Sequence, residues 1–311
     1  MNNSYPTISV IIPTLNGEKS LVRFFDALKA QTVQPDEILV GDSSSGDATV
    51  EICIANGAKV ITIPRTEFDH GGTRTKLAQQ SRGEIIVFFT QDAILADQDG
   101  IKRLIRPLLE SSQIACSYGR QLPSEGAEVI AAHLRCFNYP PVSSVRDYSD
   151  RMHHGLKTVF ISNSFAAYKK DQLEAVGFFK NGLIFGEDTC TLGRLLLEGY
   201  QVAYISEAAV YHSHNYSLIE EFKRSFDIGV LHKSESWLLE TYGRAEGIGK
   251  QYVLSVFEML WQKRKYLLMV ECIFRSICKF TGYKLGKAYT SLPVALRPCL
   301  SLHKLWWQKH P

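Results

Sequence analysis

The carboxylates best placed to do chemistry follow short apolar runs in the first half of the chain. Asp42 comes just after the run 37–40, and Asp92 comes after Ile85–Phe89, five apolar residues in a row. Such runs are typical of strands buried on both faces of a parallel sheet. Ligands of open α/β sheets bind beyond the carboxyl ends of the strands, so both side chains are expected at one edge. There Asp92 could hold a divalent cation and its diphosphate, or it could simply cap a turn.

Two loops carry groups that suit a nucleotide. The loop from Asp42 to Asp47 is dense in hydroxyls and carboxylates that can accept from a base and bond a ribose. Alternatively, Ser45 or Asp47 only caps the helix that follows. The segment 67–74 has two adjacent glycines, which permit close backbone approach. Its last residue, Arg74, opens a helix, a position suited to phosphate. The segment matches neither a Walker loop nor a GxGxxG motif.

Alternating strands and helices must position these groups. Strands are expected at 8–12, 37–40, 59–63 and 85–89, and helices around 21–28, at 48–55 and at 73–81. This alternation predicts a parallel sheet covered by helices. The polar, proline-interrupted stretch 121–150 is expected to be a mobile loop over the site. A strand is expected at 160–165.

Composition is that of a globular protein with a basic tail. The chain has 311 residues, 45% of them apolar and 22% charged. Its seven cysteines form no CxxC pair, which favours free thiols in a reducing compartment. No signal peptide is visible, so we expect a cytoplasmic protein.

From Lys250 onward there are 11 Lys or Arg against two acids, and the preceding part has 24 against 30. This asymmetry suggests attraction to an anionic surface, either nucleic acid or membrane. The tail also contains Trp261, Trp306 and Trp307. No apolar run approaches the roughly 20 residues that span a bilayer, so the tail is expected to lie on a membrane rather than cross it.

Several motifs together resemble one family. They are 10–16 (VIIPTLN), the loop 42–49, 68–74 (FDHGGTR), 90–93 (TQDA), 186–188 (GED) and 211–217 (YHSHNYS). The chain is similar to family 2 glycosyltransferases, in their bacterial rhamnosyltransferase branch. The resemblance implies an α/β GT-A fold, a Rossmann-like mixed sheet flanked by helices, over residues 1–216. Residues 217–311 would then form a basic amphipathic helical tail for the membrane surface, for dimerisation, or for both.

The resemblance also implies how the sugar nucleotide binds. Asp42 would bind the nucleobase with Thr14 nearby, and Ser45 and Gln91 are placed among the donor-binding residues. Arg74 would face the diphosphate.

Asp92 corresponds to the second carboxylate of the family's Asp-x-Asp metal motif, whose first position is Thr90 here. His212 matches a metal ligand of several relatives, which implies a site for Mg²⁺ or Mn²⁺. His214 lies two residues further in an extended segment, so both rings would face one side; of the two, His212 is favoured.

Glu187 and Asp188 precede a helix with leucines at 192, 195 and 196 on one face. Acids at a helix start are common because the dipole favours them. With a donor site in place, we favour Asp188 as the general base that deprotonates the acceptor hydroxyl. Glu187 would orient the acceptor.

The resemblance therefore implies an inverting, metal-assisted transferase. It would move L-rhamnose from dTDP-β-L-rhamnose to a lipid-linked saccharide of an O-antigen-like polysaccharide, at the inner face of the cytoplasmic membrane. Neither a nucleic acid partner nor a membrane span is expected, and a homodimer stays open.

Another sugar nucleotide is the first alternative. A sugar nucleotidyltransferase usually has a glycine-rich loop with a Lys or Arg after the first strand, where this chain has Pro13–Asn16. A third alternative is an inactive membrane-bound scaffold. The presence of both Asp92 and Asp188 argues against it, because a scaffold would not need these acids.

Overall fold

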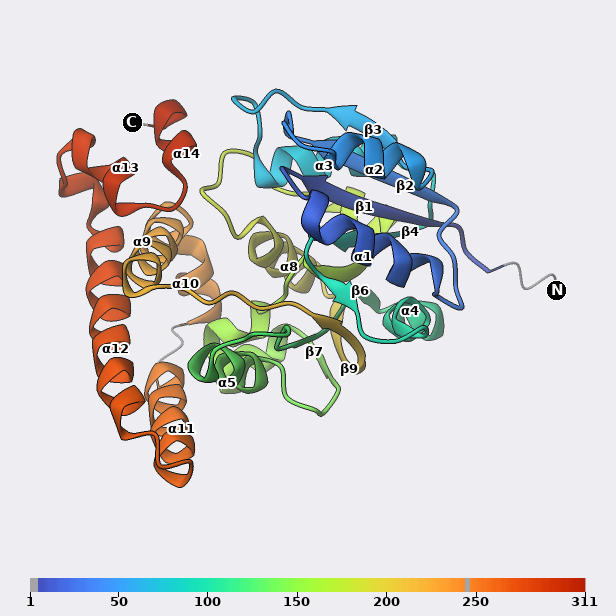
Figure 1. Cartoon of the computed structure of the whole chain (residues 1–311). Coiled ribbons are helices and arrows are strands. Elements are labelled where there is room, and N and C mark those ends of the chain that lie inside the picture. The colour runs from blue at the N-terminus through green and yellow to red at the C-terminus, as the bar shows by residue number, and fades with distance from the viewer. Residues whose placement is uncertain (1–4, 244–246, 311) are drawn as a thin grey trace.

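A computed structural model of the chain describes residues 5–243 and 247–310. In this part of the chain a nine-stranded mixed sheet forms the centre, helices cover both of its faces, and the C-terminal helices stand at one side (Figure 1). The strands are β1 (Ile8–Thr14), β2 (Glu37–Asp42), β3 (Lys59–Thr62), β4 (Ile85–Phe89), β5 (Ile94–Leu95), β6 (Ile114–Leu122), β7 (Ser144–Arg146), β8 (Phe165–Lys169) and β9 (Gln201–Tyr211). The expected α/β class with a mixed sheet is confirmed.

The sheet has the order β3-β2-β1-β4-β8-β6-β9-β5, and β7 pairs with β9 outside this path. The first four strands in that order are parallel to one another, as the alternation in the sequence predicts. β8 then runs antiparallel to both β4 and β6, while β6 and β9 are parallel. The parallel half therefore ends at β4, the strand that precedes Asp92.

The apolar runs bury side chains on both faces because successive residues of a strand point to opposite sides. In β4, Ile86 and Phe88 join the core cluster on one face, and Val87 and Phe89 join the cluster on the other. All four are fully buried. The helices before the tail are α1 (Glu18–Lys29), α2 (Thr49–Ala55), α3 (His70–Gln80), α4 (Gly100–Glu110), α5 (Val129–Asn138), α6 (Arg151–His154), α7 (Lys170–Ala175) and α8 (Glu187–Leu197).

Two local expectations are wrong. The stretch 121–150 is not a structureless loop, because it contains α5 and β7. Apolar residues of α5 such as Ile130 pack in a small cluster with α11 and α12. The helix was missed because the stretch as a whole is polar. The strand expected at 160–165 instead begins at Phe165, where pairing with Phe89 of β4 starts. Residues 162–164 form a loop that reaches Asp188.

The tail consists of helices that share the core of the sheet. They are α9 (Leu218–Ser234), α10 (Ser236–Tyr242), α11 (Ile248–Gln262), α12 (Tyr266–Lys287), α13 (Arg297–Leu300) and α14 (Lys304–Lys309). Phe226, Val230 and Trp307 belong to the same core cluster as Phe88. A division into domains at 216 and 217 stays a prediction, although α9 does begin at Leu218.

Glycines bring α9 and α12 into backbone contact. A Cβ at Gly286 would overlap the carbonyl oxygen of Phe226, and one at Gly282 would overlap that of Phe222. Likewise, Gly229 of α9 faces the carbonyl of Tyr283. A side chain at any of these glycines would push the helices apart, so the glycines fix which face of α12 is turned inward.

Within the described residues, no helix is both long enough and apolar enough to cross a membrane. The seven cysteines are all free thiols, as expected from their number and spacing, and four of them are buried.

Candidate active site

The predicted nucleoside-binding residues meet at the carboxyl ends of β1 and β2. The parallel register pairs Thr14 with Asp42, and the Thr14 hydroxyl donates to Asp42 Oδ1 at 3.0 Å. Ser45 donates to the same carboxylate twice, from its hydroxyl at 2.6 Å and from its backbone N–H at 2.9 Å. Thr14 and Asp42 are buried. The structure thus brings the three residues together, and their contact with a nucleotide stays a prediction.

Gln91 joins the loops that follow β1 and β4. Its side-chain oxygen accepts from the N–H of Leu15 at 2.9 Å, and its amide nitrogen donates to the Leu15 carbonyl at 3.0 Å. Both ends of the amide are therefore used to hold Leu15 in place. In this arrangement Gln91 shapes the wall of the expected donor site.

Asp92, His212 and His214 form a cluster that could hold a metal ion. One ligand atom from each residue lies within 4.8 Å of the others. Asp92 Oδ1 is 3.4 Å from His212 Nε2, and Asp92 Oδ2 is 4.0 Å from His214 Nε2. The cluster exists because β5 pairs antiparallel with the end of β9, with Ile94 opposite Tyr211. That pairing brings the segment just before β5 next to the residues after β9.

Gln121 fixes the orientation of His212. Its side-chain oxygen lies 3.1 Å from His212 Nδ1 and also accepts from Arg135. The contact at Nδ1 fixes the ring so that Nε2 is the nitrogen that faces Asp92. Sequence reasoning missed Gln121 and Arg135, because neither lies in a recognisable motif.

The electrostatics of the cluster suit a cation. Burial raises the pKa of Asp92, but the hydrogen bond and charge of His212, together with the charge of His214, hold it well below the usual aspartate range. Burial and the neighbouring His212 lower the pKa of His214 to about 4. At neutral pH, Asp92 is therefore ionised and His214 is an uncharged imidazole, the form that binds metal. The family motif favours His212 alone, whereas the structure brings both histidines to Asp92, as their two-residue spacing indicates.

Arg74 does not lie free beside the donor site. Its guanidinium forms a buried ion pair with Glu187 Oε1 at 3.0 Å and donates to the carbonyl of His70 at 3.3 Å. The helix carrying it starts at His70, because the Asp69 carboxylate caps α3 by accepting from the N–H of Gly72 at 2.6 Å. Two residues predicted for separate tasks, donor and acceptor binding, thus form one pair.

Asp188 lies in the first turn of α8 with its carboxylate at the 162–164 loop. It accepts from the backbone N–H of Asn163 at 3.2 Å and from that of its neighbour Thr189 at 2.7 Å. Gly186 precedes the helix with φ of 78°, a left-handed conformation that glycine adopts without strain. Burial, and then the charge of Glu187, raise the pKa of Asp188 to about 6. A carboxylate with a pKa near neutrality can accept a proton and release it again.

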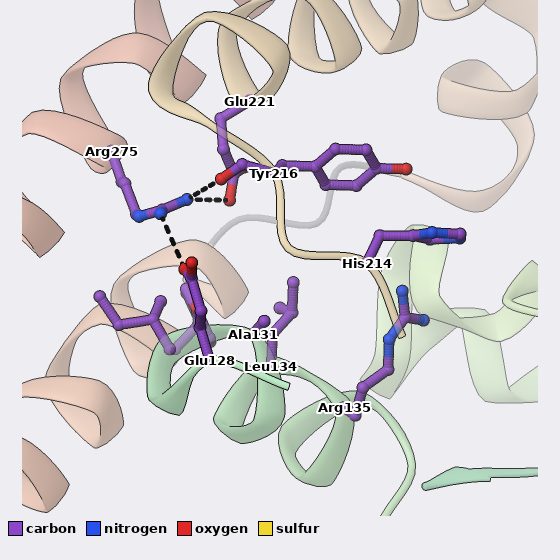
Figure 2. A pocket seen from close by; sticks show the side chains of 10 residues that line it. Glu128, Ala131, Leu134, Arg135, His214, Tyr216, Glu221 and Arg275 are labelled. Atoms are coloured by element: carbon purple, nitrogen blue, oxygen red, sulfur yellow. Dashed lines mark hydrogen bonds and ion pairs between the residues drawn. The ribbon is translucent and has the colours of Figure 1, made fainter. Parts of the chain in front are cut away.

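Further cations surround the cluster. Arg135 and His214 line one small pocket between α5, the segment 212–217 and α12 (Figure 2). The guanidinium of Arg224 lies 5.5 Å from the ring centre of Phe185 and 5.9 Å from that of Tyr216. No ion pair of Arg224 with an acid is found among the residues that the structure describes.

The family is shown by comparison with known proteins. The model of the glycosyl transferase family 2 matches residues 9–177, more than half of the chain. The chain belongs to glycosyltransferase family 2. This glycosyltransferase is 40% identical over 302 residues to the O-antigen chain rhamnosyltransferase RfbN of Salmonella typhimurium, with 96% of each chain covered. It is 38% identical to the O-antigen chain rhamnosyltransferase WbaN of Salmonella anatum, over 97% of this chain and 96% of WbaN.

Solved structures support the GT-A fold. A mannosyltransferase of Pyrobaculum calidifontis, solved with GDP-Man and Mn²⁺, superposes with a TM-score of 0.62 at 15% identity, covering 92% of this chain and 89% of its own. Glucosyl-3-phosphoglycerate synthase of Mycobacterium tuberculosis, solved with Mn²⁺, UDP and glucosyl-3-phosphoglycerate, gives a TM-score of 0.53 at 22% identity and covers 78% and 82%.

Proposed function

We propose that this glycosyltransferase moves L-rhamnose from dTDP-β-L-rhamnose to a lipid-linked saccharide of an O-antigen-like polysaccharide. The main support is its 40% identity, through nearly the whole length of both chains, to a relative named as an O-antigen chain rhamnosyltransferase. It would act in the cytoplasm as a peripheral protein at the inner face of the membrane, and the basic tail supports that placement.

A divalent cation fits the cluster of Asp92, His212 and His214. One carboxylate and two imidazoles suit Mn²⁺ better than Mg²⁺, because Mg²⁺ prefers oxygen ligands throughout. The family's Asp-x-Asp motif has a first carboxylate where this chain has Thr90. The two histidines would replace that carboxylate as metal ligands. A bound cation would offset the negative charge that develops on the departing diphosphate.

Asp188 would act as the base in a direct displacement. Its carboxylate takes the proton of the acceptor hydroxyl while that oxygen bonds to the anomeric carbon. The bond from this carbon to the diphosphate oxygen breaks, and its electron pair leaves with dTDP. Attack from the face opposite the leaving group inverts the β-rhamnoside to an α-linkage. Glu187, fixed by Arg74, would orient the acceptor beside this base.

Cations other than Arg74 would hold the diphosphate. Because Arg74 is committed to Glu187 in a buried pair, its charge is already compensated. Arg224 has no such pair within the described ranges, and Arg135 is linked to the metal cluster through Gln121. We propose that these two guanidinium groups contact the diphosphate, since arginine forks match phosphate oxygens.

A thermal-shift panel tests the donor. Purified protein is melted with dTDP-rhamnose, UDP-glucose or GDP-mannose, each with Mn²⁺, with Mg²⁺ and with a chelator. A ligand that binds only the folded state raises the melting temperature by mass action. We expect the largest rise with dTDP-rhamnose and Mn²⁺. An equal or larger rise with a UDP or GDP sugar, without one for dTDP-rhamnose, would assign a different sugar nucleotide.

A further inference from the structure

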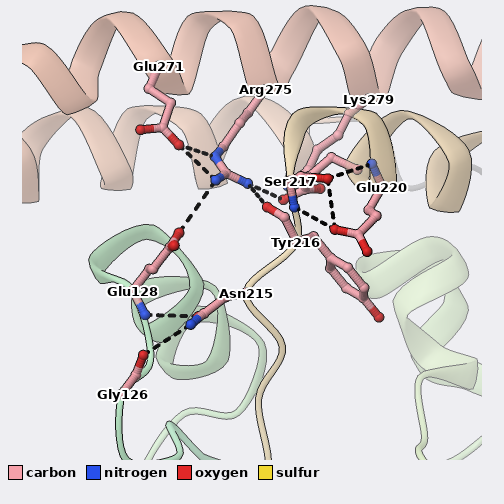
Figure 3. A network of polar contacts seen from close by, with 10 residues as sticks. Gly126, Glu128, Asn215, Tyr216, Ser217, Glu220, Glu271, Arg275 and Lys279 are labelled. Carbon is pink, nitrogen blue, oxygen red and sulfur yellow. Dashed lines mark hydrogen bonds and ion pairs between the residues drawn. The ribbon is translucent and has the colours of Figure 1, made fainter.

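Helix α12 turns Arg275 and Lys279 toward the rest of the chain and exposes a row of apolar residues on its opposite side. Arg275 is only 8% exposed. It pairs with Glu221 of α9, Glu271 of its own helix and Glu128, just before α5 (Figure 3). Lys279 also pairs with Glu221, at 3.2 Å. These contacts leave the opposite side of the helix without a partner in the described chain.

The outward side is a continuous apolar face. We define it as the α12 face, made of Tyr266, Leu267, Val270, Ile273, Phe274, Ile277 and Phe280, all exposed. Their spacing of three and four residues places them on one side of a helix. Leu267 is 87% exposed and Phe280 is 64% exposed. A helix that served only to cover its own domain would turn this face inward, but Gly282 and Gly286 hold the other side against α9.

Basic residues frame both ends of the α12 face. Lys263, Arg264 and Lys265 form the exposed turn before the helix, next to the exposed Trp261. At the other end Lys284 is exposed and its ammonium lies 5.5 Å from the ring centre of Phe280. The one acid in the sequence of α12, Glu271, is engaged with Arg275.

We propose that the α12 face docks on a lipid bilayer with anionic headgroups. The helix would lie in the plane of the interface, with its apolar side chains at the acyl boundary and the basic turn among the headgroups. A second copy fits less well, because both ends of the face are basic and either pairing direction brings like charges together. The proposal deepens the proposed function, on which its choice of a lipid surface rests in part.

The Trp306–Trp307 pair is not the lipid contact that the tail composition suggests. Trp307 is buried against Phe226. Trp306 donates from its indole to the carbonyl of Gly182 at 3.0 Å, in the loop that leads to α8. Trp307 is therefore part of the core and Trp306 is half-buried, which leaves Trp261 as the exposed tryptophan beside the α12 face.

The docked helix would be connected to the metal cluster. Arg275 donates to the carbonyl of Tyr216 at 2.6 Å, and Tyr216 lies two residues after His214. The pocket in Figure 2 is lined by Arg275 on the α12 side and by His214 on the side of the cluster. The pocket lies on the inward side of α12, so these contacts join the helix to the metal cluster from the side opposite the α12 face.

Vesicle co-sedimentation of the full chain tests the proposal. The probes are vesicles of phosphatidylcholine alone and vesicles with phosphatidylglycerol. The double variant Phe274→Glu/Ile277→Glu is compared with Ile54→Glu/Met152→Glu, which alters similarly exposed apolar positions outside the tail. We expect tight binding to phosphatidylglycerol vesicles, at least a tenfold loss in the α12 variant, and no loss in the control.

A second pair of variants keeps the test independent of helix folding. Lys263→Gln/Arg264→Gln/Lys265→Gln should weaken binding about a hundredfold, because each of the three charges near an anionic surface contributes a factor of about five. The matched triple on α1, Lys19→Gln/Arg23→Gln/Lys29→Gln, should leave it unchanged. Absence of vesicle binding by the natural protein, or a dimer in solution that only the α12 variant dissociates, would overturn the proposal. Nucleotide-sugar binding is measured separately, so failure of the donor assignment would not alter the vesicle result.

Discussion

Replacing Asp188 by asparagine should lower activity and raise stability at the same time. The carboxylate is ionised at pH 7 although its surroundings raise the pKa from 3.8 to about 6. A shift of about two units corresponds to about 3 kcal/mol by which the folded state disfavours the charge. Asparagine removes that charge, but it accepts less strongly from the N–H groups of Asn163 and Thr189. We therefore expect a net gain of about 1 to 2 kcal/mol in the free energy of unfolding at pH 7.

The sign of the pH dependence follows from the same shift. Between pH 4 and 6 the folded protein keeps a proton on Asp188 that the unfolded chain has lost, so stability falls as pH rises through this window. The gain from Asp188→Asn should be largest above pH 6 and should vanish near pH 4. Turnover should fall by about 10²- to 10⁴-fold if the base is lost, and in the natural enzyme it should decline below pH 6 as Asp188 becomes protonated.

Urea unfolding at pH 4.5 and pH 7, together with dTDP release in the presence of acceptor, measures both effects. Asp171→Asn serves as the control, because Asp171 is an exposed acid in the first turn of α7. An acid that merely stabilises a helix start would give the opposite result: Asp188→Asn would lose about 1 kcal/mol and would keep its activity. That outcome would refute the assignment of Asp188 as the base.

Three further predictions concern the donor site and the tail. Asp92→Asn should weaken the binding of both Mn²⁺ and dTDP-rhamnose by at least tenfold in isothermal titration. If only one of the two ligands binds more weakly, the metal does not link Asp92 to the donor. Arg74→Gln should lower the unfolding free energy by about 3 to 5 kcal/mol, because it leaves a buried carboxylate unpaired. Arg224→Gln should leave stability unchanged and raise the Kd for dTDP. If Arg74→Gln instead weakens dTDP binding without a loss of stability, Arg74 rather than Arg224 contacts the diphosphate. Gly286→Ala should lower the free energy of unfolding in urea by about 1 to 3 kcal/mol, because its Cβ meets a backbone carbonyl. Gly249→Ala, which has open space around it, should leave this free energy unchanged. Equal stabilities of the two variants would show that α9 and α12 can move apart without a loss of stability.

Local patterns in the sequence are enough to place together the residues that are predicted to bind the donor. The apolar runs that become β1, β2 and β4 are short-range signals, and parallel strands carry their final residues to one edge. The order of strands and helices along the chain therefore places Thr14, Asp42 and Asp92 at the same edge, and the GT-A fold follows from the same alternation together with the family motifs.

The tertiary structure alone decided which distant residues share a contact. The metal cluster needs β5 to pair with β9, and the ion pair of Arg74 with Glu187 needs α3 to pack beside α8. A composition count could show that the tail is basic and apolar, but it could not show which side of α12 faces out. That choice depends on Gly282 and Gly286 meeting α9, because the cost of a backbone overlap outweighs the burial that the apolar face would gain by turning inward.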